Sequence, residues 1–257
     1  MWKRWWPSLH SFSFDGYTFS LATSFSDGAE IKMTKGSTTY HTQIRTIAIG
    51  SDSTTVQWLV TYASSKNPVQ RVQQAKSALK IKSDLDELLQ HLKNFAEKTE
   101  NIYGFNIRRT TFTDTLLAAK KFAGKEYPSL TEIYKTIHQV RQTLSSQGIV
   151  TTGYPMLNVN RKDSALYETM IAIPVNKKPL PQHTVFFTRM ISMKDKFLFT
   201  EVTGGPGTIQ NAHGAINQYM NDHSLSAPAI PFEVLITDRS QEADTSKWKT
   251  LVYHPSM

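Results

Sequence analysis

The second half of the sequence contains an internal repeat, in which two strands, a helix and two further strands follow one another twice. In the first copy we expect strands over 106–112 and 115–122, a helix from Leu130, and a hairpin over 156–160 and 167–175. In the second copy we expect strands over 185–190 and 197–202, a helix over about 209–223, and a closing pair of strands that contain 234–236 and 251–253. Such copies usually join about a pseudo-twofold axis, and the groove between them is a natural ligand site.

Local signals in the first copy support its helix. Ser129 and Glu132 have the spacing of a capping box, and Gly148 is a typical C-terminal stop. The apolar residues between them recur at helical spacing and predict a buried stripe: Leu130, Ile133, Ile137, Val140 and Leu144.

The first half of the sequence has a different organisation. Up to about residue 65 it contains short strands separated by turn signals such as Asp15-Gly16 and Asp27-Gly28, which predicts an antiparallel meander. From 69 to 98 the period becomes helical, with an apolar face that we expect to pack on this sheet: Ile81, Leu85, Leu88, Leu89, Leu92 and Phe95. The chain is therefore predicted to form two α+β domains, 1–99 and 100–257.

The charge balance permits contact with nucleic acid or a membrane surface, but its distribution argues against both. The formal charge is +8, and the basic residues are scattered along the sequence without a recognition-helix pattern. No apolar run approaches a membrane span, and we expect no signal peptide, because residues 1–10 are rich in tryptophan and basic and lack an apolar core. The tryptophans Trp2, Trp5 and Trp6, beside Lys3 and Arg4, could lie at a bilayer. We prefer that they close one end of the first sheet, or stay exposed where a missing segment would cover them.

We therefore expect no nucleic-acid partner for this chain and no membrane contact. We expect a cytoplasmic protein, or one that is anchored through a segment upstream of Met1.

Several chemistries lack the residues that they need. There is no cysteine, and His138, His213 and His223 do not have ligand spacing, so we expect no metal and no cofactor. Gly204-Gly-Pro-Gly207 lacks the lysine of a phosphate-binding loop and is read as a tight turn. No glycine-flanked serine indicates a nucleophile elbow.

One carboxylate occupies an unusual place near the end of the chain. Glu233 lies between Phe232 and Val234 in a strand that otherwise favours burial. Strand alternation either points this side chain into water or turns it into a pocket, where a buried carboxylate needs a partner.

The region 100–257 resembles the GyrI-like effector-binding domain. The resemblance rests on the duplicated order, on Pro231-Phe232-Glu233, and on the closing strand Trp248-Lys-Thr-Leu-Val-Tyr253. Residues 36–98 resemble the back half of an SRPBCC (START-like, polyketide-cyclase-like) domain, through Thr54-Thr-Val-Gln-Trp58, Asn67-Pro68 and the long helix. Residues 1–35 do not supply the strand and two short helices that open that family, so this domain would be trimmed or reduced.

The resemblance gives the conspicuous carboxylate a role. It implies that Glu233 lies at the base of an aromatic-lined cavity that binds lipophilic cations, and that in some members it acts on small strained esters. Trp248 would stack against the ligand, and Tyr167 is its equivalent in the first copy. Glu201 is a further acid that could line the same groove, whereas Glu168 is expected at the surface.

The alternative is that Trp248 and Tyr167 are core aromatics and that Glu233 pairs with Arg239 or a lysine. We favour binding of a small hydrophobic molecule, which can carry a positive charge, by a sensor or sequestering protein. A hydrolase with Glu233 as its catalytic carboxylate is the second hypothesis, and a purely structural pair of domains is the third. On the first, Glu233→Gln weakens cation binding while the melting temperature stays unchanged or rises.

Overall fold

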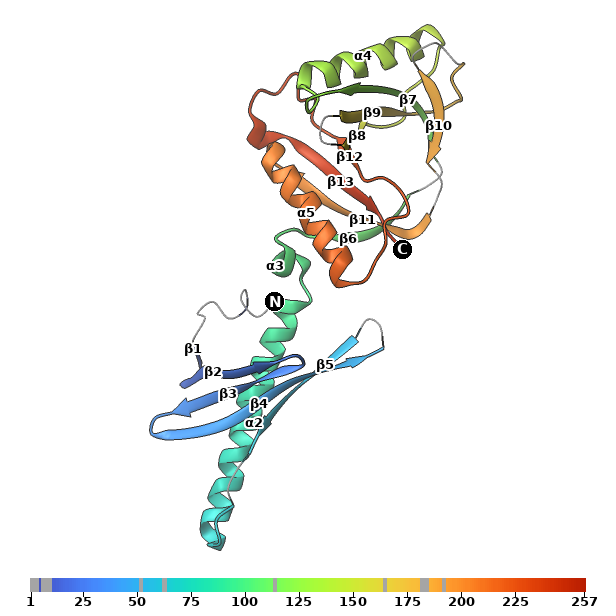
Figure 1. The fold of residues 1–257 in the computed structure, drawn as a ribbon. Helices are drawn as coiled ribbons and strands as arrows, with labels where there is room; N and C mark the ends of the chain where they lie inside the picture. Colours follow the sequence, from blue (N-terminus) through green and yellow to red (C-terminus); the bar gives the residue numbers. More distant parts are fainter. Residues whose placement is uncertain are drawn as a thin grey trace. The chain divides into compact units, whose positions relative to one another are not determined.

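The computed structural model describes residues 5, 11–50, 53–61, 64–112, 115–163, 166–180, 185–190 and 193–257. The chain divides into two compact units, residues 1–102 and 103–257 (Figure 1). Of the N-terminal tryptophans, Trp5 is described and its ring contacts that of Phe12 edge-on, at 5.5 Å between centroids. Trp2 and Trp6, with Lys3 and Arg4, lie outside the described residues.

The first unit is an antiparallel meander, as its turn signals predicted. Its five strands lie in chain order in the sheet: β1 (Ser11–Phe14), β2 (Tyr17–Phe25), β3 (Gly28–Lys35), β4 (Thr38–Ile49) and β5 (Ser53–Val60). Asp15 and Gly16 both have positive φ, 45° and 75°, which produces the tight turn between β1 and β2.

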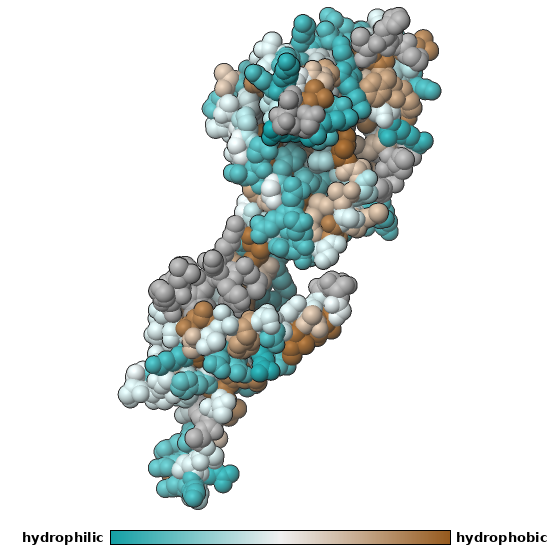
Figure 2. Space-filling view, in the orientation of Figure 1, coloured by the Kyte–Doolittle hydropathy of each residue, from teal (hydrophilic) through white to brown (hydrophobic). Residues whose placement is uncertain are grey.

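The helix α2 (Pro68–Ala96) covers one face of this sheet. The Asn67 side chain accepts a hydrogen bond from the Val69 backbone N–H, and Pro68 occupies the first turn, where its missing N–H costs nothing. The expected apolar face is largely confirmed, since four of its members are buried against the sheet: Ile81, Leu85, Leu88 and Leu92. Hydrophobic patches also remain on the surface of this unit (Figure 2). Its exposed apolar side chains include Ile47, Ile49 and Leu59.

The second unit follows the short helix α3 (Thr99–Tyr103) and is built on an eight-stranded sheet. The strand order is β10-β7-β9-β8-β12-β13-β11-β6. The first copy supplies β6 (Arg108–Phe112), β7 (Thr115–Gly124), α4 (Leu130–Ser146), β8 (Met156–Asp163) and β9 (Leu166–Val175). The second supplies β10 (Phe186–Met190), β11 (Met193–Thr203), α5 (Pro206–Asp222), β12 (Phe232–Leu235) and β13 (Lys249–Pro255).

This strand order confirms the duplicated fold with pseudo-twofold symmetry. If each strand is replaced by its equivalent in the other copy, the strand order reads the same in the opposite direction. The first strand of each copy pairs with the second strand of the other copy, β6 with β11 and β10 with β7. The two copies therefore exchange their edge strands, and neither forms its half of the sheet alone.

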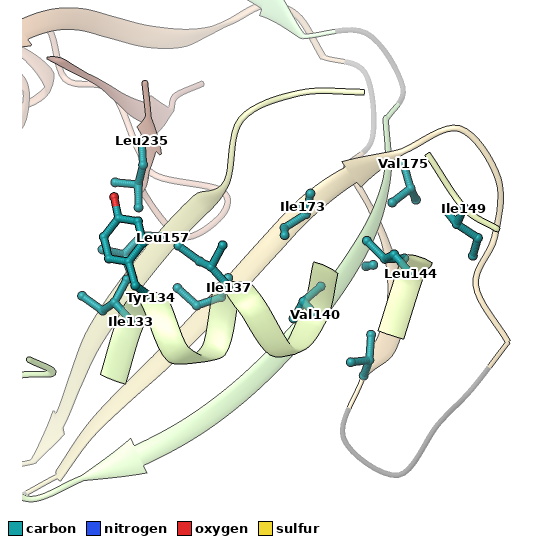
Figure 3. Packing of buried hydrophobic residues seen from close by; sticks show 13 residues of the cluster. Ile133, Tyr134, Ile137, Val140, Leu144, Ile149, Leu157, Ile173, Val175 and Leu235 are labelled. Atoms are coloured by element: carbon teal, nitrogen blue, oxygen red, sulfur yellow. The ribbon is translucent and has the colours of Figure 1, made fainter. Parts of the chain in front are cut away.

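Both helices of the second unit pack on the same face of the sheet. The α4 residues Ile133, Ile137 and Val140 lie against β8 and β9, with Leu235 from β12 nearby (Figure 3). The capping box at Ser129 and Glu132 is present. Helix α5 packs on β11 and β13 through Ile209 and Ile216, and begins at Pro206, three residues before the expected start. The opposite face carries an aromatic cluster of Phe112, Phe197, Phe199, Phe232 and Tyr253.

Candidate functional site

Glu233 is buried on the helix-covered face of the sheet. It lies in β12 opposite Leu157 of β8 and Val252 of β13. Because directly paired residues project to the same side, the carboxylate shares the face of these two core side chains. Only 6% of Glu233 is exposed, so the strand does not point it into bulk water.

A cavity of about 610 Å³ lies beside this carboxylate. Its wall includes Leu130 and Ile133 of α4, together with Pro206 and Ile209 of α5, which places it at the N-terminal ends of both helices. Of the four residues that the sequence predicted to bind a ligand, three line it, from three separate segments: Tyr167, Glu233 and Trp248. The volume of this cavity, and its lining of apolar, aromatic and charged side chains, are typical of a small-molecule site.

Glu201 does not line this cavity. It follows the buried Thr200 and precedes the buried Val202, which packs with α5, so alternation along β11 places Glu201 on the opposite face. Its side chain is exposed there. Glu168 is also outside the cavity and forms an ion pair with Lys162, with 3.0 Å between Nζ and Oε1.

The carboxylate has a buried partner, Arg239, from the loop after β12. Arg239 Nη2 donates to Glu233 Oε2 at 3.1 Å and to Thr250 Oγ1 at 2.8 Å. Only 8% of Arg239 is exposed, and its guanidinium lies over the Trp248 ring, 5.0 Å from the centroid. Glu233 therefore both lines the cavity and pairs with Arg239, although the sequence alone left these two arrangements as alternatives.

The loop that carries Arg239 is fixed by backbone contacts. The Arg239 backbone N–H donates to the Tyr134 hydroxyl at 2.6 Å, and this hydroxyl donates to the Thr237 carbonyl at 3.2 Å. Helix α4 of the first copy thus holds the arginine of the second copy against Glu233.

Trp248 is held at its edge and through its backbone. Its Nε1 donates to the Glu242 carbonyl at 2.9 Å, and its own carbonyl accepts from the Gly204 backbone N–H at 2.9 Å. Gly204 has φ 147°, and a Cβ there would lie 2.7 Å from Thr208 Oγ1, so only glycine fits. The glycine-rich turn therefore positions the start of α5 next to Trp248.

Tyr127 and Arg161 complete the polar part of the wall, and the sequence interpretation missed both. The Tyr127 ring meets that of Tyr167 edge-on at 5.9 Å, and the Arg161 guanidinium lies 5.8 Å from the Tyr167 ring centroid. Although 49% of Tyr127 is exposed, burial of its hydroxyl and the charge of Glu233 raise its pKa to about 12. Tyr127 thus remains a neutral hydrogen-bond donor at physiological pH.

Two histidines extend the site behind the carboxylate. His213 Nε2 of α5 lies 3.6 Å from Glu233 Oε1, and His213 Nδ1 is hydrogen-bonded to His254 Nε2 of β13 at 2.8 Å. Burial, and then the charge of His213, lower the pKa of His254 to about 4. His213, Glu233 and Tyr127 border a second cavity of about 160 Å³ that shares part of its wall with the larger one.

No signal in the sequence indicated the role of these histidines. From the sequence, His213 is considered only with His138 and His223, as members of a metal site that we do not expect, and nothing local connects positions 213 and 254. Within the part of the chain that the structure describes, no cluster of three metal-binding side chains occurs, and no helix is both long and apolar enough to span a bilayer.

A separate cavity of about 390 Å³ lies on the other face of the sheet. Its wall is mainly apolar and includes Met156, Met170, Met190 and Phe232. It contains none of the four predicted residues.

Comparison with known proteins supports the fold. No family model and no curated protein matches the sequence. The crystal structure of the EcmrR C-terminal domain matches with a TM-score of 0.51 and 14% identity, over 60% of this chain and 98% of that domain. A cryo-EM structure of an EcmrR–DNA complex matches with a TM-score of 0.53 and 16% identity, over 73% of this chain and 69% of that one.

A weaker likeness, with a TM-score of 0.36 and 14% identity, is to SAV2435 bound to tetraphenylphosphonium, over 60% of this chain and 93% of that one. At these identities the two EcmrR structures establish a shared fold and nothing further. The 60% matched to the EcmrR domain is the share of the chain that residues 103–257 make up.

Proposed function

We propose that the second unit is a GyrI-like effector-binding domain, which binds a small hydrophobic molecule in the cavity bordered by Glu233, Trp248 and Tyr167. The observation that carries the proposal is that three distant segments bring a carboxylate and two aromatic rings to one cavity of about 610 Å³. Folds host many functions, so the shared fold with the EcmrR domain adds support but does not carry the argument.

The ligand that this site fits best has a hydrophobic body and a polar or positive group. Aromatic faces attract a cation by ~0.5–2 kcal/mol, and Glu233 supplies a carboxylate at the wall. Arg239 already donates a hydrogen bond to Oε2 of Glu233, so the negative charge of this carboxylate is partly neutralised before a ligand binds. A hydrophobic cation is therefore accepted through Oε1 and the rings together, rather than through a free carboxylate.

Hydrolysis is the less favoured function. A catalytic carboxylate must take a proton or attack a substrate, and here one oxygen accepts a charge-assisted hydrogen bond from a buried arginine. Turnover of small esters that disappears in Glu233→Gln would establish a hydrolase in place of a binding protein. We propose no nucleic-acid partner for this chain, because its basic residues are scattered.

Calorimetric titration with tetraphenylphosphonium, and with neutral hydrophobic molecules of similar size, tests the proposal. Glu233→Gln is expected to weaken cation binding by about tenfold or more, about 1.4 kcal/mol. Glu201→Gln is the matched control, since its carboxylate lies on the opposite face of the same sheet. Absence of binding by every probe, or equal losses in the two variants, would remove the proposed site.

A further inference from the structure

A connected set of side chains leads from the cavity wall into the sheet. Arg239 holds Oε2 of Glu233, and His213 faces Oε1 with its Nε2 at 3.6 Å. The other nitrogen of His213 is bonded to the buried His254, at 2.8 Å. Glu233 therefore has one permanently charged partner and one partner whose charge depends on pH.

Only one of the two rings can carry a positive charge, and the carboxylate of Glu233 faces His213, so the charge is expected on His213. Two protonated rings cannot share the bond between Nδ1 and Nε2, because both atoms would be donors. When His213 is charged, both its nitrogens donate, so His254 accepts and is neutral. The lowered pKa of His254, about 4, agrees with this order.

When His213 is neutral, the same contacts persist with the roles reversed. His254 Nε2–H then donates to His213 Nδ1, and His213 Nε2 remains the ring nitrogen next to Glu233. Protonation consequently changes the charge beside the carboxylate without requiring a rearrangement of the rings.

We propose that His213 determines which ligand charge the cavity prefers, by releasing its proton when a hydrophobic cation binds at Glu233. This inference rests on the proposed function. A positive group in contact with Glu233 comes within about one Debye length, ~8 Å, of His213, where like charges in a partly buried site repel. Because linkage is reciprocal, protonated His213 lowers the affinity for the cation by the same factor.

The groups that face His213 come from three other parts of the second unit. They are Glu233 from β12, His254 from β13, and Tyr127 from the segment before α4, with Arg239 beyond the carboxylate. Tyr127 stays neutral and Arg239 stays charged in the range in which histidines titrate.

Titration of the full chain with tetraphenylphosphonium between pH 5 and 8 tests the inference. The affinity of the wild-type protein is expected to rise roughly tenfold with pH, within the ~5- to 150-fold range of typical couplings. Calorimetry in buffers of different ionisation enthalpy should report proton release on binding at the lower pH. His213→Asn keeps a polar side chain that can form a hydrogen bond with His254, but this side chain cannot be protonated. The affinity of this variant for the cation should therefore vary much less with pH.

The matched control is His138→Gln, which removes an exposed histidine of α4 outside both cavities and should keep the wild-type pH profile. Thermal unfolding of each variant confirms that it is folded. A wild-type affinity that is constant or falls with rising pH, or an unchanged profile in His213→Asn, overturns the inference while leaving a binding site. Absence of binding at every pH and for every probe overturns the proposed function as well.

Discussion

Glu233 and Leu157 lie directly opposite each other in the antiparallel pair of β12 and β8, where the two copies of the repeat meet. This pair sits on the pseudo-twofold axis, so the two residues are structural equivalents. One copy places a carboxylate at this point and the other an apolar side chain. The symmetric fold therefore contains a polar site with one charged side, which suits a single ligand.

The Glu233–Arg239 pair should be mutually dependent in stability. Arg239→Met leaves a carboxylate buried without its cation, and is expected to lower the free energy of unfolding by about 3–5 kcal/mol. The double variant Glu233→Leu with Arg239→Met restores the apolar residue of the other copy and should recover most of this loss. Urea unfolding of both single variants and the double variant gives the coupling, and additive losses would contradict a mutual pair.

The same pair reverses one expectation from the sequence. On the hypothesis that Glu233 faces a ligand pocket without a partner in the protein, Glu233→Gln leaves the melting temperature unchanged or raises it. Because Arg239 is buried and loses its countercharge in that variant, we now expect the melting temperature to fall. An unchanged value would show that the buried pair contributes little.

Trp248→Phe should weaken both binding and stability. The change removes the hydrogen bond to the Glu242 carbonyl and part of the ring beneath the Arg239 guanidinium. We expect affinity for a hydrophobic cation to drop by ~0.5–2 kcal/mol, together with loss of ligand-induced quenching of tryptophan fluorescence. Trp58→Phe, which removes a hydrogen bond to Thr42 in the first unit, should leave affinity as in wild type.

Acid should destabilise the second unit through His254. Its pKa falls from 6.5 to about 4 on folding, because the buried ring is held neutral, so the unfolded chain binds the proton more readily. The stability that this group contributes is complete above about pH 6.5 and is lost as pH falls toward 4, by up to ~1.4 kcal/mol per pH unit. Denaturant unfolding from pH 7 to 4 measures the slope, and His254→Phe should reduce it.

Ser129→Ala tests the cap of the helix that borders the cavity. The variant loses the hydrogen bond that the Ser129 hydroxyl accepts from the Glu132 backbone N–H and the one that it donates to the Glu132 carboxylate, and should cost about 1 kcal/mol of unfolding free energy. Ser145→Ala, at an exposed position near the other end of α4, should change stability by no more than ~0.5 kcal/mol. Equal effects of the two substitutions would show that the capping box does not stabilise α4.

The parts of the fold that depend on near neighbours could be predicted from the sequence. The Ser129 cap, the meander turns and the α2 stripe all rest on spacings within a few residues, and the structure contains them. The duplication was also visible, because each copy repeats the same local signals. Tyr167 and Trp248 could be paired through it, as equivalent positions of the two copies.

Tertiary structure decided the partners and the directions of the side chains. Register between strands from distant segments turned Glu233 toward the cavity and Glu201 away from it, and a one-residue change of register would have reversed both. The contacts of Glu233 with Arg239 and His213, and of His213 with His254, join residues that no local spacing relates. The sequence thus determined which elements form, because propensity and capping act locally. Only the folded sheet determined the electrostatics of the site, because charges interact according to distances that packing sets.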